Sequence, residues 1–130
     1  MIFLDANLLI YLNVGVKDVA RFFEELLEKY TLYTDALVLD EVIYVSWHKY
    51  GVPFEHTVSF LDDIVLPYTK VLSLGYEEYS EAKTLLNLLK PSDALHVVAM
   101  LNNGIRVIAS EDRDFERVEG IRRLWIEYDR

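Results

Sequence analysis

Four acidic residues stand at positions suited to binding a divalent metal ion: Asp5, Glu41, Asp93 and Asp112. Asp5 and Asp112 come shortly after the apolar segments 1–4 and 106–109, which have the pattern of buried strands. Asp93 falls in the first turn of a predicted helix, where the helix dipole favours a negative charge. Glu41 lies within the apolar segment 37–43, where an unpaired charge is costly. In an open parallel sheet, ligands bind beyond the carboxyl ends of the strands, so we expect these acids to meet there.

Carboxylates crowded together repel one another and raise each other's pKa values unless a cation neutralises them. The sequence contains no cysteine, so carboxylates and imidazoles are the ligands available to a metal ion. Oxygen ligands of this kind favour Mg²⁺ or Mn²⁺. Each acid taken alone also has a structural explanation, as a turn residue, a helix cap or part of a solvated helix face.

The elements that must position these acids alternate along the chain. We expect strands at 1–4, 70–74, 106–109 and 123–127, and helices at 16–30, 35–50, 54–65, 76–89 and 93–102. Ser92 suits the N-cap of the last helix, and Asn103-Gly104 suits its C-terminal end. This order predicts an α/β fold, with a central, mostly parallel sheet of about four to five strands and helices on both faces.

Length and composition indicate one globular domain over residues 1–130. Hydrophobic residues make up 52% of the chain, enough to bury a core, which excludes a disordered or low-complexity chain. Asp5 follows the first apolar residues so closely that neither a signal peptide nor a membrane span can begin there. We therefore expect a soluble cytoplasmic protein that does not associate with a membrane.

Four segments, in this order, resemble the motifs of the PIN domain family, the metal-dependent ribonuclease fold used by VapC-type toxins and RNA-processing enzymes. They are residues 3–7 (FLDAN), Glu41 with the apolar run after it, residues 91–96 (PSDALH) and residues 108–115 (IASEDRDF). The last is the most specific, since a hydroxyl residue precedes two acids that bracket one position. The resemblance covers essentially the whole chain and implies a PIN-like domain.

By this resemblance Asp5, Glu41, Asp93 and Asp112 match the acidic quartet of the family, which holds one or two Mg²⁺ or Mn²⁺ ions. Asn7 and Ser110 match its supporting polar positions, and Asp114 is a further supporting or auxiliary acid. The implied activity is that of an endoribonuclease, which hydrolyses a phosphodiester bond with a metal-activated water. Asp5 and Asp93 would be the main ligands. Asp112 would complete the second metal position or bind through a water, and Glu41 would hold a metal-bound water or help deprotonate the attacking one. A homodimer and an antitoxin partner are further implications.

The net charge of −9 argues against binding RNA through a broad basic surface. Neutralisation of the acids by metal ions weakens this objection, and the second half of the chain is nearly balanced. Lys90, beside Asp93, and Arg113, beside Asp112, are the candidate phosphate-binding residues. An ion pair of Arg113 with Asp114 or Glu116 is about as plausible.

His96 lies one helical turn after Asp93, and we interpret it as a packing or supporting residue rather than a metal ligand. Tyr44, Trp47 and Tyr50 recur every three residues after Glu41. They suit base stacking or partner binding, but core packing or a dimer interface is the favoured interpretation.

Two rival classes require residues that this chain lacks, and one alternative outside enzymology stays open. Haloacid-dehalogenase-like phosphatases also begin with an apolar strand and an Asp, but they need a second Asp where this chain has Asn7. A receiver-like signalling domain needs paired acids near its first strand and a late Lys, which are not evident here. The alternative outside enzymology is a PIN-fold protein that serves RNA processing or protein assembly without a toxin role.

Overall fold

Five parallel strands form one sheet in the order β3-β2-β1-β4-β5 within residues 1–127, the part of the chain that the computed structural model describes. The strands are β1 (Ile2–Leu4), β2 (Leu32–Asp35), β3 (Thr69–Leu72), β4 (Val107–Ala109) and β5 (Arg122–Leu124). Phe3 in the central strand β1 pairs with Tyr33 of β2 on one side and Ile108 of β4 on the other. The predicted α/β class with a parallel sheet is confirmed. Residues 128–130 of the predicted domain lie outside the described residues.

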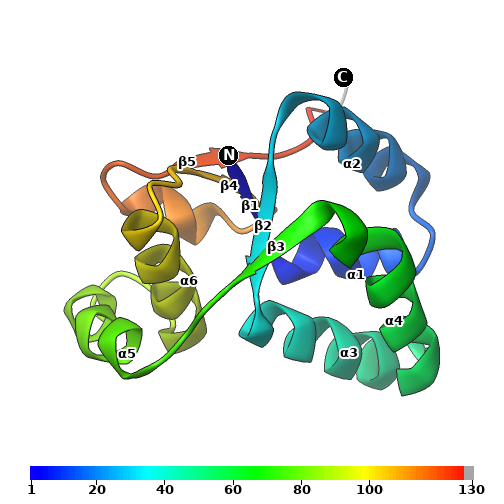
Figure 1. The fold of residues 1–130 in the computed structure, drawn as a ribbon, viewed down its shortest axis with the longest axis horizontal. Coiled ribbons are helices and arrows are strands. Elements are labelled where there is room, and N and C mark those ends of the chain that lie inside the picture. Colours follow the sequence, from blue (N-terminus) through cyan, green and yellow to red (C-terminus); the bar gives the residue numbers. More distant parts are fainter. Residues whose placement is uncertain (128–130) are drawn as a thin grey trace.

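Six α-helices connect and cover these strands. They are α1 (Ala6–Asn13), α2 (Lys17–Lys29), α3 (Ala36–Tyr50), α4 (Phe54–Phe60), α5 (Tyr76–Ala82) and α6 (Pro91–Asn102). Figure 1 shows α5 and α6 on one side of the sheet and α1, α2 and α4 on the other. Helices on both faces explain why β1 is buried throughout, because a parallel sheet of this kind meets solvent on neither face.

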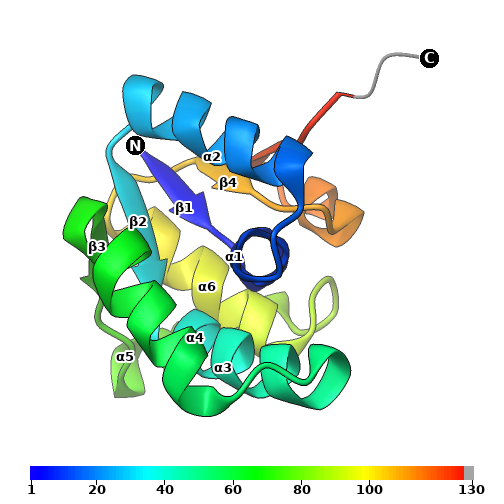
Figure 2. The same cartoon turned by 90° about the vertical axis from the view of Figure 1, so that its right-hand side faces the viewer.

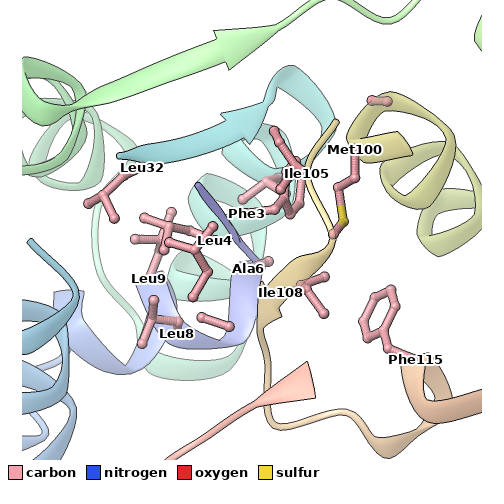
Figure 3. Close-up of a cluster of buried hydrophobic side chains, with 14 of the residues drawn as sticks. Phe3, Leu4, Ala6, Leu8, Leu9, Leu32, Met100, Ile105, Ile108 and Phe115 are labelled. Atoms are coloured by element: carbon pink, nitrogen blue, oxygen red, sulfur yellow. The ribbon is translucent and has the colours of Figure 1, made fainter. Parts of the chain in front are cut away.

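The core is built around β1 and the elements beside it. Figure 3 shows Phe3 and Leu4 of β1 among apolar side chains from α1, β4 and α6. Phe115, from the short 3₁₀ helix Arg113–Arg117, is also fully buried and anchors the segment that follows β4. The strand ends that carry the candidate site therefore rest on closely packed apolar side chains.

Helix ends follow local backbone preferences. The predicted helix at 35–50 is confirmed as α3, which ends at Gly51 with a left-handed φ of 70°. The N-cap of α6 is Lys90 and not Ser92, so that prediction is wrong. Pro91 explains the difference, since its restricted φ and missing N–H suit the first helical position.

Four other predicted elements end earlier in the structure, and one helix and one strand were not predicted. The helix expected at 54–65 is α4, which ends at Phe60 and continues as the π-helical turn Leu61–Val65, and the strand expected at 70–74 is β3, which ends at Leu72.

The helix expected at 76–89 ends at Ala82 and continues as a 3₁₀ turn, Lys83–Leu85. Lys90, directly before Pro91, is extended, as expected for the residue that precedes a proline. The strand expected at 123–127 is β5, which ends at Leu124. Helix α1 and strand β2 were not predicted. None of the described helices is long and apolar enough to cross a membrane.

Candidate metal centre

The candidate site lies at the carboxyl edge of the sheet. Asp5 directly follows β1, Ser110 directly follows β4, and Asp35 is the last residue of β2. Asp93 is in the first turn of α6. Figure 2 shows β1 pointing toward α1, with α3 and α6 below that end of the strand. Parallel strands thus bring residues from distant parts of the chain to one edge, as predicted.

Asp5 is held by hydrogen bonds to both of its carboxylate oxygens. The residue is only 5% exposed. Its Oδ1 accepts from the backbone N–H of Ala6 at 2.8 Å, which caps α1. Its Oδ2 accepts from the Ser110 hydroxyl at 2.6 Å and from Asn7 Nδ2 at 3.4 Å. These bonds fix the orientation of the carboxylate, and all of their donors are neutral groups.

Ser110 and Asn7 connect the end of β1 to the loop after β4. Besides donating to Asp5, Ser110 Oγ accepts from Asn7 Nδ2 at 3.1 Å and from the backbone N–H of Asp112 at 3.0 Å. Asn7 Oδ1 accepts from the backbone N–H of Glu111 at 3.2 Å. The two polar side chains therefore position both Asp5 and the loop that carries Asp112.

Asp93 is a buried carboxylate that lacks full hydrogen bonding. It is 6% exposed, and its Oδ2 is buried without a hydrogen-bond partner. The Lys90 ammonium lies 3.9 Å from this oxygen, too far for a hydrogen bond. Burial, followed by the negative charge of Asp5, raises the pKa of Asp93 to about 6. A buried oxygen of this kind is suited to a cation.

Glu41 and Asp112 lie near Asp5 and Asp93 but do not belong to the buried group that these two acids form with His96. Glu41 lies within an apolar segment of the sequence, but its side chain is exposed, because its apolar neighbours in sequence lie on other faces of α3. Partial burial of its carboxyl group and the charge of Asp5 nevertheless raise its pKa. Asp112 is half-buried, and its charge contributes to the raised pKa of Asp93.

Asp114 is directed to a different partner. Its Oδ1 lies 3.3 Å from the Arg117 guanidinium, and its backbone N–H donates to Asp112 Oδ1 at 2.9 Å. The backbone of Asp114 therefore orients Asp112, while its own carboxylate forms an ion pair at the surface. Arg113 is exposed, and within residues 1–127 it forms no ion pair with Asp114 or Glu116. Glu116 is instead bound by Arg123.

A buried pair of hydrogen-bonded side chains, His96 and Asp35, lies beside these acids and was not predicted. His96 Nδ1 and Asp35 Oδ2 are 2.5 Å apart, and both side chains are almost fully buried. Burial alone lowers the pKa of His96, but the hydrogen bond and charge of Asp35 raise it above its usual value. Asp35 was placed at the start of a helix, and its partner lies 61 positions further along the chain. An acid before an apolar helix indicates a cap, but it cannot reveal so distant a partner.

The residues present fit a divalent cation. One ligand atom each from Asp5, Asp93 and His96 lie within 4.8 Å of one another, and all three residues are buried. Two of these residues are carboxylates, and Asp93 has an oxygen that no donor satisfies. A bound cation would satisfy that oxygen and offset the repulsion between Asp5 and Asp93.

The aromatic residues predicted to pack in the core or at a dimer interface do not pack in the core, and the dimer interface stays a prediction. Tyr44, Trp47 and Tyr50 of α3 are all exposed. Tyr44 stacks on His48 with ring centroids 5.4 Å apart, and Trp47 contacts Phe54 of α4 at 5.2 Å. These rings pack on one another beside the core, and the stripe stays open to solvent.

Comparison with known proteins agrees with this architecture. The sequence profile of the PIN domain matches residues 2–121. A search of the curated proteins finds no match. Among solved structures, the chain is similar to VapBC2 from Rickettsia felis, which was solved bound to a DNA fragment from its promoter. The two share 21% identity with a TM-score of 0.72. That similarity covers 96% of this chain and 98% of the other.

Two further structures are similar in fold. VapC20 from Mycobacterium tuberculosis, a sarcin-ricin loop cleaving toxin, shares 18% identity with a TM-score of 0.73, over 89% of this chain and 93% of that one. A toxin-antitoxin complex from Klebsiella pneumoniae shares 16% identity with a TM-score of 0.71, over 93% and 95%. At these identities the likeness concerns the fold, whereas the profile match extends over nearly the whole sequence. The chain belongs to the PIN domain family.

Proposed function

We propose that this protein is a metal-dependent endoribonuclease that uses Mg²⁺ or Mn²⁺. The observation that carries the proposal is the buried Asp93, which has an unsatisfied oxygen and a pKa raised to about 6 beside Asp5. A buried pair of carboxylates destabilises a fold unless a cation or a proton offsets the repulsion, and such pairs cluster at functional sites. A divalent cation both relieves the repulsion and provides the chemistry for phosphodiester hydrolysis.

In this proposal Asp5 and Asp93 bind the ion directly. Asp112 and Glu41 complete the quartet, because each is close enough to influence, or be influenced by, the charge of the first two. Ser110 and Asn7 orient Asp5 through the bonds described above. When bound, the ion supplies a Lewis acid for the attack of water on a phosphate. Asp114 has an auxiliary role, since its backbone orients Asp112.

RNA is the proposed substrate, and Lys90 and Arg113 are the proposed phosphate-binding residues. Lys90 lies beside Asp93, and Arg113 is exposed without an ion-pair partner within residues 1–127. Arg113 and Arg123 also line a groove along residues 124–127. A similar fold in a toxin that cleaves the sarcin-ricin loop supports an RNA substrate.

We further propose a toxin of the VapBC type, which acts in the cytoplasm as a homodimer and is inhibited by an antitoxin protein. Similar folds in toxin-antitoxin complexes support this proposal. The exposed aromatic stripe of α3 provides apolar surface that a protein partner would cover. The alternative is a PIN-fold protein for RNA processing or assembly, without a toxin role.

Calorimetric titration of Mn²⁺ into the purified protein tests the metal site first. We expect saturable binding by the wild type, and weakening of at least about tenfold in Asp5→Asn and Asp93→Asn. Asp62→Asn removes the same charge from an exposed position of the π-helical turn Leu61–Val65 and should leave binding unchanged. If all three variants bind Mn²⁺ like the wild type, the assigned site is wrong.

Cleavage of a structured RNA pool, with Mn²⁺ and with EDTA, then tests the activity. We expect the wild type and Asp62→Asn to cleave the RNA in the presence of Mn²⁺. EDTA should abolish this cleavage, and Asp93→Asn should show none. Binding of Mn²⁺ and RNA without cleavage by any form would favour the assembly alternative.

A further inference from the structure

The buried pair of Asp35 and His96 has no role in the proposed quartet, yet it lies directly beside it. Asp35 is fully buried, His96 is 2% exposed, and the atoms that join them are 2.5 Å apart. Burial of two ionisable side chains is costly unless each satisfies the other, so a pair of this kind needs an explanation.

The pair joins two helices that otherwise pack mainly on different neighbours. Asp35 Oδ1 accepts from the backbone N–H of Val38 at 3.0 Å and caps α3, while its Oδ2 bonds to His96 of α6. Helix α3 packs chiefly on α1 and α4, whereas α6 packs on α5. Glu41 follows on α3 and Asp93 precedes His96 by one turn on α6. One carboxylate thus connects the start of α3 to the middle of α6, the two helices that carry these acids.

The imidazole ring is also held from the side of the sheet. Phe3 of β1 packs against it with ring centroids 5.4 Å apart at an angle of 38°. The strand that directly precedes Asp5 therefore contacts the same ring that binds Asp35. Elements carrying Asp5, Glu41 and Asp93 all meet at His96.

We propose that Asp35 and His96 form a positioning pair that sets the spacing between Asp5 and Asp93, and that His96 acts through Nδ1 and not as a ligand of the metal. This inference rests on the proposed function. The bond to Asp35 occupies Nδ1, because an ionised carboxylate only accepts hydrogen bonds and the ring N–H at this position donates to it. A carboxylate that orients a group beside a metal site contributes through geometry, and its loss typically weakens metal binding about 10–100-fold.

Four variants distinguish the role of Nδ1 from that of Nε2 in His96, and the bond to Asp35 from the capping of α3. His96→Asn keeps an N–H donor near the position of Nδ1, whereas His96→Gln keeps one near Nε2. Asp35→Ser keeps a cap for α3 but is too short to reach His96. The double variant Asp35→Ser/His96→Gln completes a cycle. Asn13→Ala is the control, because it removes two hydrogen bonds, to Ser46 and Thr57, that do not touch the site.

The measurement is Mn²⁺ affinity by calorimetry, with folding checked by near-ultraviolet circular dichroism. We expect His96→Gln and Asp35→Ser each to weaken binding by about 10–100-fold, and the double variant to be no weaker than either, because the pair acts as a unit. His96→Asn should retain most of the affinity. Asn13→Ala should lose stability but not affinity, which separates positioning from general destabilisation.

Electron spin-echo spectroscopy of Mn²⁺ bound to the wild-type protein gives a readout that needs no variant to fold. No ¹⁴N coupling from an imidazole is expected. A clear ¹⁴N coupling would overturn the proposal by making His96 a ligand, as would equal losses in His96→Asn and His96→Gln. Unchanged affinity in both His96→Gln and Asp35→Ser would overturn it as well. Failure of the wild type to bind Mn²⁺ would instead refute the metal site of the proposed function.

Discussion

The Ser110 hydroxyl donates to Asp5 Oδ2 at 2.6 Å, although the two residues are 105 positions apart. This bond joins the ends of the neighbouring strands β1 and β4. Ser110 also accepts the backbone N–H of Asp112, so one hydroxyl orients two acids of the proposed quartet. The site therefore depends on a neutral side chain as much as on its charged ones.

Replacement of Ser110 by Ala should weaken both the fold and the site. The variant loses the three hydrogen bonds of a fully buried hydroxyl, and the unfolding free energy in urea should fall by about 1–3 kcal/mol. Mn²⁺ affinity should fall as well, since Asp5 keeps only the longer bond from Asn7 at its Oδ2. Ser59→Ala, at an exposed position of α4, should change neither quantity. Equal stability of Ser110→Ala and the wild type would contradict the hydrogen-bond assignment.

The stability of the metal-free protein should depend on pH through Asp93. Its pKa rises from an ordinary 3.8 to about 6 on folding, so the folded state holds this proton more tightly than the unfolded state. The resulting stability is complete below about pH 4 and is lost as the pH rises through about 6. The amide introduced by Asp93→Asn does not titrate, so this variant avoids the loss of stability. The unfolding free energy of the variant should therefore rise relative to that of the wild type between about pH 4 and about pH 6.

Urea unfolding of both proteins in EDTA, from about pH 4 to about pH 7, measures this difference. Glu41 and His96, whose pKa values are also raised, are present in both proteins. The charge of Asp93 contributes to the raised pKa of His96, so the difference reports Asp93 together with its interaction with His96. Parallel stability curves would show that Asp93 is not perturbed.

The two acids of the last motif should differ in their effect on the metal. Asp112→Asn should weaken Mn²⁺ binding several-fold or more, because its charge reaches Asp93. Asp114→Asn should have a much smaller effect, because its carboxylate is paired with Arg117 and its backbone N–H, which orients Asp112, is retained. Calorimetry on the two variants side by side decides the order. A larger loss in Asp114→Asn would place that acid on the metal.

Gly51 should resist substitution because of its backbone conformation. Its φ of 70° ends α3, and a Cβ there would meet nothing within 4 Å, so the cost is strain alone. We expect Gly51→Ala to lower the unfolding free energy by about 1–2 kcal/mol. Gly75→Ala is a matched comparison, since that glycine also has open space but no positive φ. Similar effects of the two substitutions would argue against the left-handed turn.

Most elements with a strong pattern were predictable from the sequence. Helix α2 has one apolar face and one charged face, and each of its ends lies within one residue of the predicted end. The apolar helix α1 was missed because its residues have no polar face whose periodicity would reveal it. Strand β2 was missed because it has only four residues, and its last residue, Asp35, also caps a helix. Local patterns fail where an element is short or apolar on all sides.

The site was predictable in its residues but not in its connections. The sequence places Asp5, Asp93 and Ser110 at strand or helix ends, and the structure brings them to one edge of the sheet. Their roles remain predictions. Neither the partner of His96 nor the exposure of Glu41 follows from local sequence, because both depend on which face of a helix meets the sheet.

The order of strands also governs when the site can exist during synthesis. Strand β1 is at the centre of the sheet, but its partner β4 begins about a hundred residues later in the chain. Such distant pairing closes late in folding. A growing chain holds Asp5 and Glu41 long before it holds Asp93, Ser110 and Asp112. Under the proposed function, a nascent chain therefore cannot cleave RNA through this site until its last strands have been added.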